Sequence, residues 1–134
     1  MSTIGHPLSD LSNLLSPYIF AVNPPNAAMQ VHCNSAFVPG GQWSGLLSQA
    51  QCLKAYSQYS GWDASSDIAW GGIFATFRNG VIMQGIAARR AQRQATSEEA
   101  QRFEKMMKPN GEFCWGLVQQ YLANKRDAPE GSKL

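Results

Sequence analysis

The stretch that decides the predicted fold is IAWGGIFATFRNGVIMQGI, residues 68–86. It contains two apolar runs, Ile68–Arg78 and Val81–Ile86, joined by the dipeptide Asn79–Gly80. Asn-Gly between two apolar runs is typical of a β-hairpin, because a type I′ turn needs positive φ at both central residues. The stretch therefore predicts a hairpin. Cross-strand pairs are expected on both of its faces, Phe77 with Ile82 and Thr76 with Met83.

The chain before this hairpin contains the elements of a second one. Apolar residues at helical spacing between Leu8 and Leu15 predict a helix, which Ser16–Pro17 should end or bend. Residues 18–22 form a short apolar run closed by the turn-forming residues 23–26. Residues 29–38 alternate between apolar and polar side chains, as expected of a half-buried strand. We expect these two strands to pair.

The other segments predict helices. Apolar residues recur at helical spacing over residues 43–56, and Gly61 is a suitable end for that helix. Residues 87–95 are rich in Ala, Arg and Gln, and Thr96 with Glu99 fits a capping box that starts a helix running to about residue 107. Pro109–Gly111 should end it, before a last helix over residues 114–126.

The predicted fold class is therefore α+β, with the element order α-β-β-α-β-β-α-α. An antiparallel sheet of about four strands, made of two hairpins, packs against the helices. The 134 residues suffice for one domain with its own core. We assign residues 1–127 to a single globular domain and residues 128–134 to a flexible polar tail.

Composition indicates a globular chain and gives little indication of a charged ligand. Hydrophobic residues make up 44%, charged residues 15%, and the formal net charge is only +2. Within residues 1–62 the only charged residues are Asp10 and Lys54. Because the centres of protein interfaces are depleted in charge, this half of the chain favours a protein partner or self-association.

Cysteine usage and the N-terminal sequence favour a cytoplasmic protein. Cys33, Cys52 and Cys114 are too few and too far apart for a disulfide framework or a CxxC motif. No Lys or Arg precedes Lys54, so the basic region of a secretory signal is missing. In a eukaryotic cell, the final residues Ser132–Leu134 would act as a peroxisomal address.

No pattern in the sequence predicts a metal or a cofactor. Asp63 and Asp67 lack the ligand density of a calcium loop, and they fit caps of turns or helices. Gly40–Gly41 and Gly71–Gly72 match neither a P-loop nor a dinucleotide fingerprint. We therefore expect neither.

An arginine cluster is the first candidate binding site. It consists of Arg78, Arg89, Arg90 and Arg93, and no acidic residue lies between positions 78 and 93. Guanidinium groups bind phosphates and carboxylates in bidentate fashion. These four residues could hold a phosphate ligand or nucleic acid, although a solvated helix face is the simpler interpretation.

Aromatic residues supply the second candidate site. Trp62 and Tyr59 lie beside a predicted loop, where a half-exposed ring can line a pocket or anchor an interface. Core positions are expected for Trp43, Trp70 and Trp115.

Catalysis has the weakest candidates. His32 and Cys33 are adjacent, but neighbours on a strand point to opposite faces, so His32 cannot activate Cys33 directly. His32 could instead serve as the base for Cys52 or Cys114 across the fold. No residue is assigned a catalytic role.

The preferred function is a small non-enzymatic binding or regulatory module that acts through protein contacts and forms homodimers. The first alternative is a binder of a phosphate ligand or nucleic acid through the arginine cluster. The second is an enzyme that depends on cysteine and histidine. No membrane contact is expected.

Overall fold

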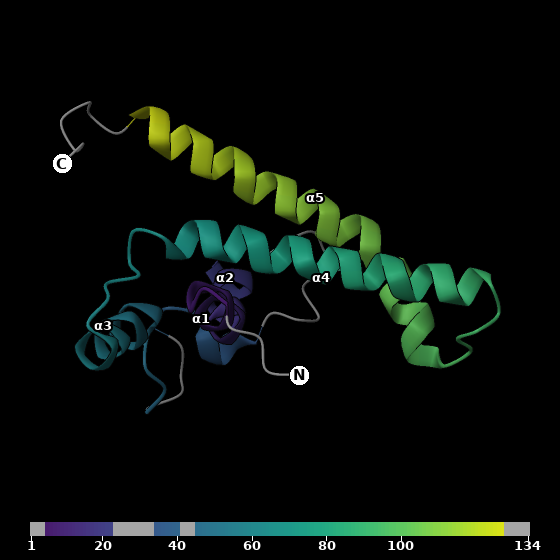
Figure 1. The fold of residues 1–134 in the computed structure, drawn as a ribbon, viewed down its shortest axis with the longest axis horizontal. Coiled ribbons are helices and arrows are strands. Elements are labelled where there is room, and N and C mark those ends of the chain that lie inside the picture. The colour runs from purple at the N-terminus through teal and green to yellow at the C-terminus, as the bar shows by residue number, and fades with distance from the viewer. Residues whose placement is uncertain (1–4, 23–33, 41–44, 128–134) are drawn as a thin grey trace.

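Every regular element in the computed structural model, which describes residues 5–22, 34–40 and 45–127, is helical (Figure 1). In chain order the elements are α1 (Leu8–Leu14), α2 (Ser16–Val22), the 3₁₀ helix η2 (Ser35–Phe37), α3 (Gln49–Ser60), α4 (Ile68–Ala91) and α5 (Glu98–Asp127). None of the three described ranges contains a strand. The predicted α+β fold with its four-stranded antiparallel sheet is therefore wrong.

The largest correction concerns residues 68–86, where the predicted hairpin is instead the body of α4. Neither Asn79 nor Gly80 has the positive φ that a type I′ turn requires. The predicted pairing of Phe77 with Ile82 is therefore also wrong. Buried positions recur every three or four residues along α4: Ile68, Gly71, Gly72, Ile73, Ala75, Thr76 and Met83. Packing of this helical face overrides the local turn signal.

Neither strand of the first predicted hairpin is found among the described residues. Residues 18–22, predicted as a strand, lie in α2. Of the second predicted strand, residues 29–33 lie outside the described residues, and Ser35–Phe37 form η2. The Asn34 side chain caps this turn by accepting a hydrogen bond of 2.9 Å from the backbone N–H of Ala36.

The third helix was predicted, and its two ends have clear causes. Ser48 and Gln51 form a capping box at the N-terminus, so α3 begins at Gln49, later than expected. Gly61 ends the helix in the left-handed region, with φ 72°, as predicted.

The last helix is continuous where a break was predicted. α5 runs for 30 residues through Pro109, and Ser97 rather than Thr96 caps its start by accepting from the N–H of Ala100 at 3.2 Å. Proline removes one backbone hydrogen bond and bends a helix. Figure 1 shows two stretches of α5 running in different directions on either side of its crossing with α4.

Two clusters of buried side chains hold the helices together. The larger one joins α1, α2, α3 and the start of α4, and its buried members are Leu11, Leu15, Tyr18, Leu53, Ala64 and Ile68. The smaller one joins Met83 of α4 to Met106 of α5. Between Met83 and the larger cluster, the two long helices cross at Gly80 and Asn110, where a Cβ on Gly80 would lie 3.0 Å from Asn110 Nδ2. The two clusters therefore fix α4 along one side.

Candidate functional site

The side of α4 that faces away from the core carries a row of large apolar residues. Trp70, Phe74, Phe77 and Val81 follow one another at intervals of four, three and four residues, so they share one face of the helix. Their exposed fractions are 50%, 43%, 60% and 50%. We call these four residues the α4 stripe.

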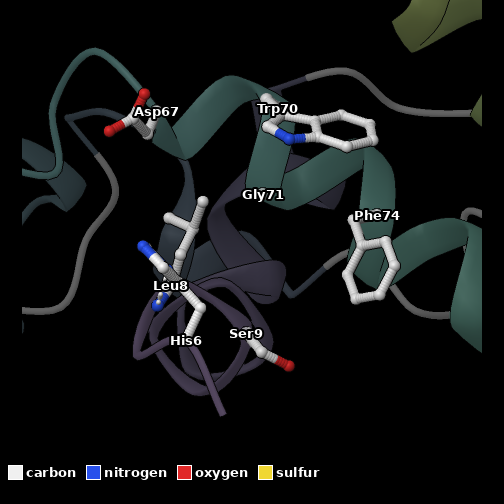
Figure 2. Close-up of a pocket in the computed structure, with 7 residues that line it drawn as sticks. All are labelled: His6, Leu8, Ser9, Asp67, Trp70, Gly71 and Phe74. Atoms are coloured by element: carbon white, nitrogen blue, oxygen red, sulfur yellow. Dashed lines mark hydrogen bonds between the residues drawn. The ribbon is translucent and has the colours of Figure 1, made fainter.

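A cavity of about 400 Å³ lies between one end of the stripe and the chain around α1. Figure 2 shows the rings of Trp70 and Phe74 on the side of α4 that also faces His6, Leu8 and Ser9. The ring centroids of Trp70 and Phe74 are 6.2 Å apart, and the ring planes are tilted by 59°. This end of the stripe therefore presents two adjacent aromatic rings beside a hollow.

A second hollow of about 410 Å³ lies between the other end of the stripe and α5. Phe77 and Val81 line it from α4, and Met107 and Trp115 line it from α5. Trp115 is 61% exposed and Met107 is 38% exposed. The apolar surface therefore continues from α4 onto α5.

Polar contacts on both flanks fix the orientation of α4. Arg78 donates hydrogen bonds to Ser9 Oγ at 3.1 Å and to Asn13 Oδ1 at 2.9 Å, which ties α4 to α1. On the other flank, Asn110 Nδ2 donates to the backbone oxygen of Thr76 at 3.1 Å. The stripe is therefore presented by a helix that is held from two sides.

Asn110 is the most unusual group at the helix crossing. The residue is 1% exposed, and its Oδ1 has no hydrogen-bond partner among the described residues. A buried acceptor without a donor costs about 1–3 kcal/mol. The crossing therefore retains a polar side chain at some cost in stability.

The chemistry of the stripe is apolar and nearly uncharged. Between Asp67 and Arg89, the only charged residue is Arg78, whose guanidinium is hydrogen-bonded to α1.

The described part of the chain contains no group of three or more His, Cys, Asp or Glu placed to hold a metal ion. Asp63 accepts from the N–H of Ser65 at 2.9 Å, and this hydrogen bonding lowers the pKa of its carboxyl. Asp63 therefore caps a turn, as predicted, whereas Asp67 stands at the N-cap of α4 without a capping hydrogen bond from its side chain.

The predicted arginine cluster is divided by the structure. Arg78 faces α1, whereas Arg90 forms an ion pair of 2.6 Å with Glu104 of α5. Arg89 and Arg93 are exposed, and Arg93 has a φ of 58° just beyond the end of α4. Two of the four guanidinium groups are therefore engaged in contacts within the fold.

The two predicted aromatic site residues lie in different environments. The Trp62 ring packs edge-on against His6 at 5.2 Å and Tyr56 at 6.1 Å, beside the larger buried cluster. Tyr59 is 93% exposed on α3. Trp62 thus packs against the core, whereas the Tyr59 side chain is almost fully exposed to solvent.

The cysteine and histidine candidates are not brought together within the described residues. His32 and Cys33 lie outside them. The Sγ atom of Cys52 lies 3.8 Å from the Tyr18 hydroxyl oxygen, and the Sγ atom of Cys114 lies 3.7 Å from the backbone oxygen of Ile73. Burial raises the pKa of the Cys114 thiol, which disfavours the thiolate that a nucleophile needs.

Sequence reasoning missed the stripe because it placed Trp70 in the core and residues 68–86 in a hairpin. Trp70 and Trp115 are half-exposed, so the prediction that they are core residues is wrong, and Trp43 lies outside the described residues. The four-three-four spacing was the available signal.

Comparisons with known proteins add no relative. Neither protein-family models, nor curated proteins, nor solved structures gave a match to this chain. Among the described residues, no helix has both the length and the apolar character needed to cross a membrane.

Proposed function

We propose that this protein is a protein-binding module that works through the α4 stripe. The observation that carries the proposal is the exposure of Trp70, Phe74 and Phe77 on a helix whose other side is packed. Exposed apolar patches rimmed by polar residues mark interaction sites, and aromatic residues dominate the binding energy of protein interfaces. The hollows on both sides of the stripe give a partner places to insert side chains.

The nearly uncharged character of the stripe favours a protein over a nucleic acid. Binding to nucleic acid requires cations along the contact surface. Arg78 is the one cation among residues 68–88, and it contacts α1. An apolar helix face instead matches a partner that contributes its own apolar side chains.

Native mass spectrometry of the protein isolated gently from its own source tests this function. We expect wild-type protein to carry the additional mass of a polypeptide, either a different chain or a further copy. Phe77→Glu should lose that mass, because the substitution places a charge in the middle of the stripe. Tyr59→Glu, at an exposed position on α3, is the matched control and should retain it.

Two results would contradict the proposal. One is a wild-type protein found only as a bare chain of 14.7 kDa. The other is a partner that Phe77→Glu retains as well as Tyr59→Glu does.

A further inference from the structure

We propose that a second copy of this chain covers the α4 stripe, with the two α4 helices packed antiparallel. This inference rests on the proposed function and names the partner for the same surface. It is carried by three features of the described residues: a difference in side-chain size between the two ends of the exposed face of α4, the area of exposed ring surface, and the near absence of charge.

Side-chain size differs between the two ends of the exposed face of α4. Beyond Val81, the same face continues at intervals of three and four residues to Gln84 and Ala88, both exposed. The face therefore has a bulky end at Trp70 and Phe74 and a small end at Ala88. Two such faces fill space evenly when they run in opposite directions, because large side chains then lie opposite small ones. In a parallel pair, bulk would meet bulk at one end, and the other end would leave a gap.

The spacing allows several antiparallel registers, and the difference in side-chain size between the two ends selects one in which the bulky end lies opposite the small end. Stripe positions alternate like the a and d positions of a heptad, and an antiparallel arrangement sets each a opposite a d of the other helix. The symmetry axis then passes at the level of Asn79. The layers formed across it are Trp70 with Ala88, Phe74 with Gln84, and Phe77 with Val81, each made twice by symmetry.

The exposed ring surface is close to the apolar area that one side of a stable dimer interface buries. Trp70, Phe74, Phe77 and Trp115 are between 43% and 61% exposed. Since an aromatic side chain offers roughly 150–250 Å² of surface, the four rings leave on the order of 450 Å² exposed. A standard interface buries about 800 Å² per partner, of which roughly 450–520 Å² is apolar. The ring surface alone therefore approaches the apolar area of one side of a dimer interface.

Charge does not oppose the pairing of two identical faces. The stripe and its small end contain no ionisable side chain, and Arg78 beside them is bound to Ser9 and Asn13. In an isologous contact, residues of the stripe face other residues of the same stripe, so a stripe that carried charges of one sign would repel its copy. This stripe does not.

Sedimentation equilibrium of the purified full-length chain tests whether the second copy binds. We expect wild-type protein to associate to twice 14.7 kDa as concentration rises. Phe77→Glu should weaken association by roughly 100-fold or more, because the symmetric dimer would bury two unpaired carboxylates. Tyr59→Glu should associate like wild type. Circular dichroism of both variants checks that the helices remain formed.

The register has its own measurement. Double electron–electron resonance measures the separation of the two α4 ends. The spin labels are placed at Gln92→Cys in a variant whose three native cysteines are replaced by serine. At 1.5 Å rise per residue, the antiparallel register predicts about 40 Å between labels. A parallel pair would place them within roughly 10–15 Å.

The outcomes separate this inference from the proposed function. A purified chain that stays monomeric, although protein from its own source carries a different polypeptide removed by Phe77→Glu, overturns the second copy and leaves the binding module standing. A dimer that Phe77→Glu leaves intact overturns the α4 interface. A short label distance overturns the antiparallel register.

Discussion

The two faces of α4 differ in the size of the residues they carry and in what lies against them. The packed face contains Gly71, Gly72 and Gly80, each of which meets a neighbouring helix so closely that a Cβ would press on a side chain there. The exposed face carries the rings of Trp70 and Phe77, which are 50% and 60% exposed among the described residues. Small residues mark where helices approach, and large apolar residues without a cover mark where another molecule can bind.

The comparison also explains why one helix can serve both purposes. The packed face is anchored by close approach to α1 and α2 and by the crossing with α5. The glycines admit these neighbours, and the neighbours then hold the opposite face in a fixed orientation. Each prediction below changes one face and uses the other as its reference.

The largest effect is expected from truncating a buried side chain on the packed face. Ile73→Ala should lower the free energy of unfolding by about 2–5 kcal/mol, because Ile73 is 6% exposed and its truncation leaves a cavity. Phe77→Ala, on the exposed face of the same helix, should change it by less than about 0.5 kcal/mol. Urea unfolding at concentrations where the protein is monomeric measures both. Equal losses would mean that the two faces do not differ as described.

An intermediate effect, opposite in sign at two positions, is expected from one substitution made twice on α4. Gly71→Ala should destabilise by about 1–3 kcal/mol, because the new Cβ would overlap Ser12 Oγ and crowd Leu8. Gly85→Ala should stabilise by about 0.5–1 kcal/mol, since open space surrounds that position and alanine favours the helix. Thermal unfolding of the two variants provides the comparison. A gain in stability for both would show that α1 does not pack on Gly71.

The smallest effect is expected from pH. Burial raises the pKa of Cys114, on the α5 wall of the second hollow, so the folded state keeps this proton at pH values where the unfolded state has lost it. The contribution of this thiol to the free energy of unfolding is therefore fully present at pH values below the unfolded thiol pKa of about 8.5, and it decreases as pH rises above that value. Urea midpoints measured between about pH 7 and pH 9.5 should fall less steeply in Cys114→Ala than in wild type. Identical slopes would show that Cys114 does not contribute.

Local signals in the sequence predicted several element ends but not the fold class. Gly61 was correctly predicted to end α3, because a helix C-terminus in the left-handed region suits glycine. Asn79–Gly80 gave the wrong prediction, because glycine serves here to admit Asn110 rather than to supply a positive φ. The break predicted at Pro109 was also wrong, because α5 continues through it and packs on α4 on both sides, through Met106 before it and Cys114 after it.

The candidate site was harder to predict than the helices. The arginine cluster is contiguous in sequence, yet Arg78 and Arg90 turn to different helices and bind there. The four stripe residues can be read from the sequence, but they share one face only if residues 68–86 form a helix. An error in one element therefore hid the surface.

By itself, the sequence determined the composition of the chain, its sparse charge, and the helix periodicity that α4 and α5 follow. Only the tertiary structure decided whether the apolar residues of α4 were to be buried. The physical reason is that burial depends on which faces neighbouring helices cover. α1, α2 and α5 cover the glycine side of α4, where they can approach closely, and leave the ring side exposed.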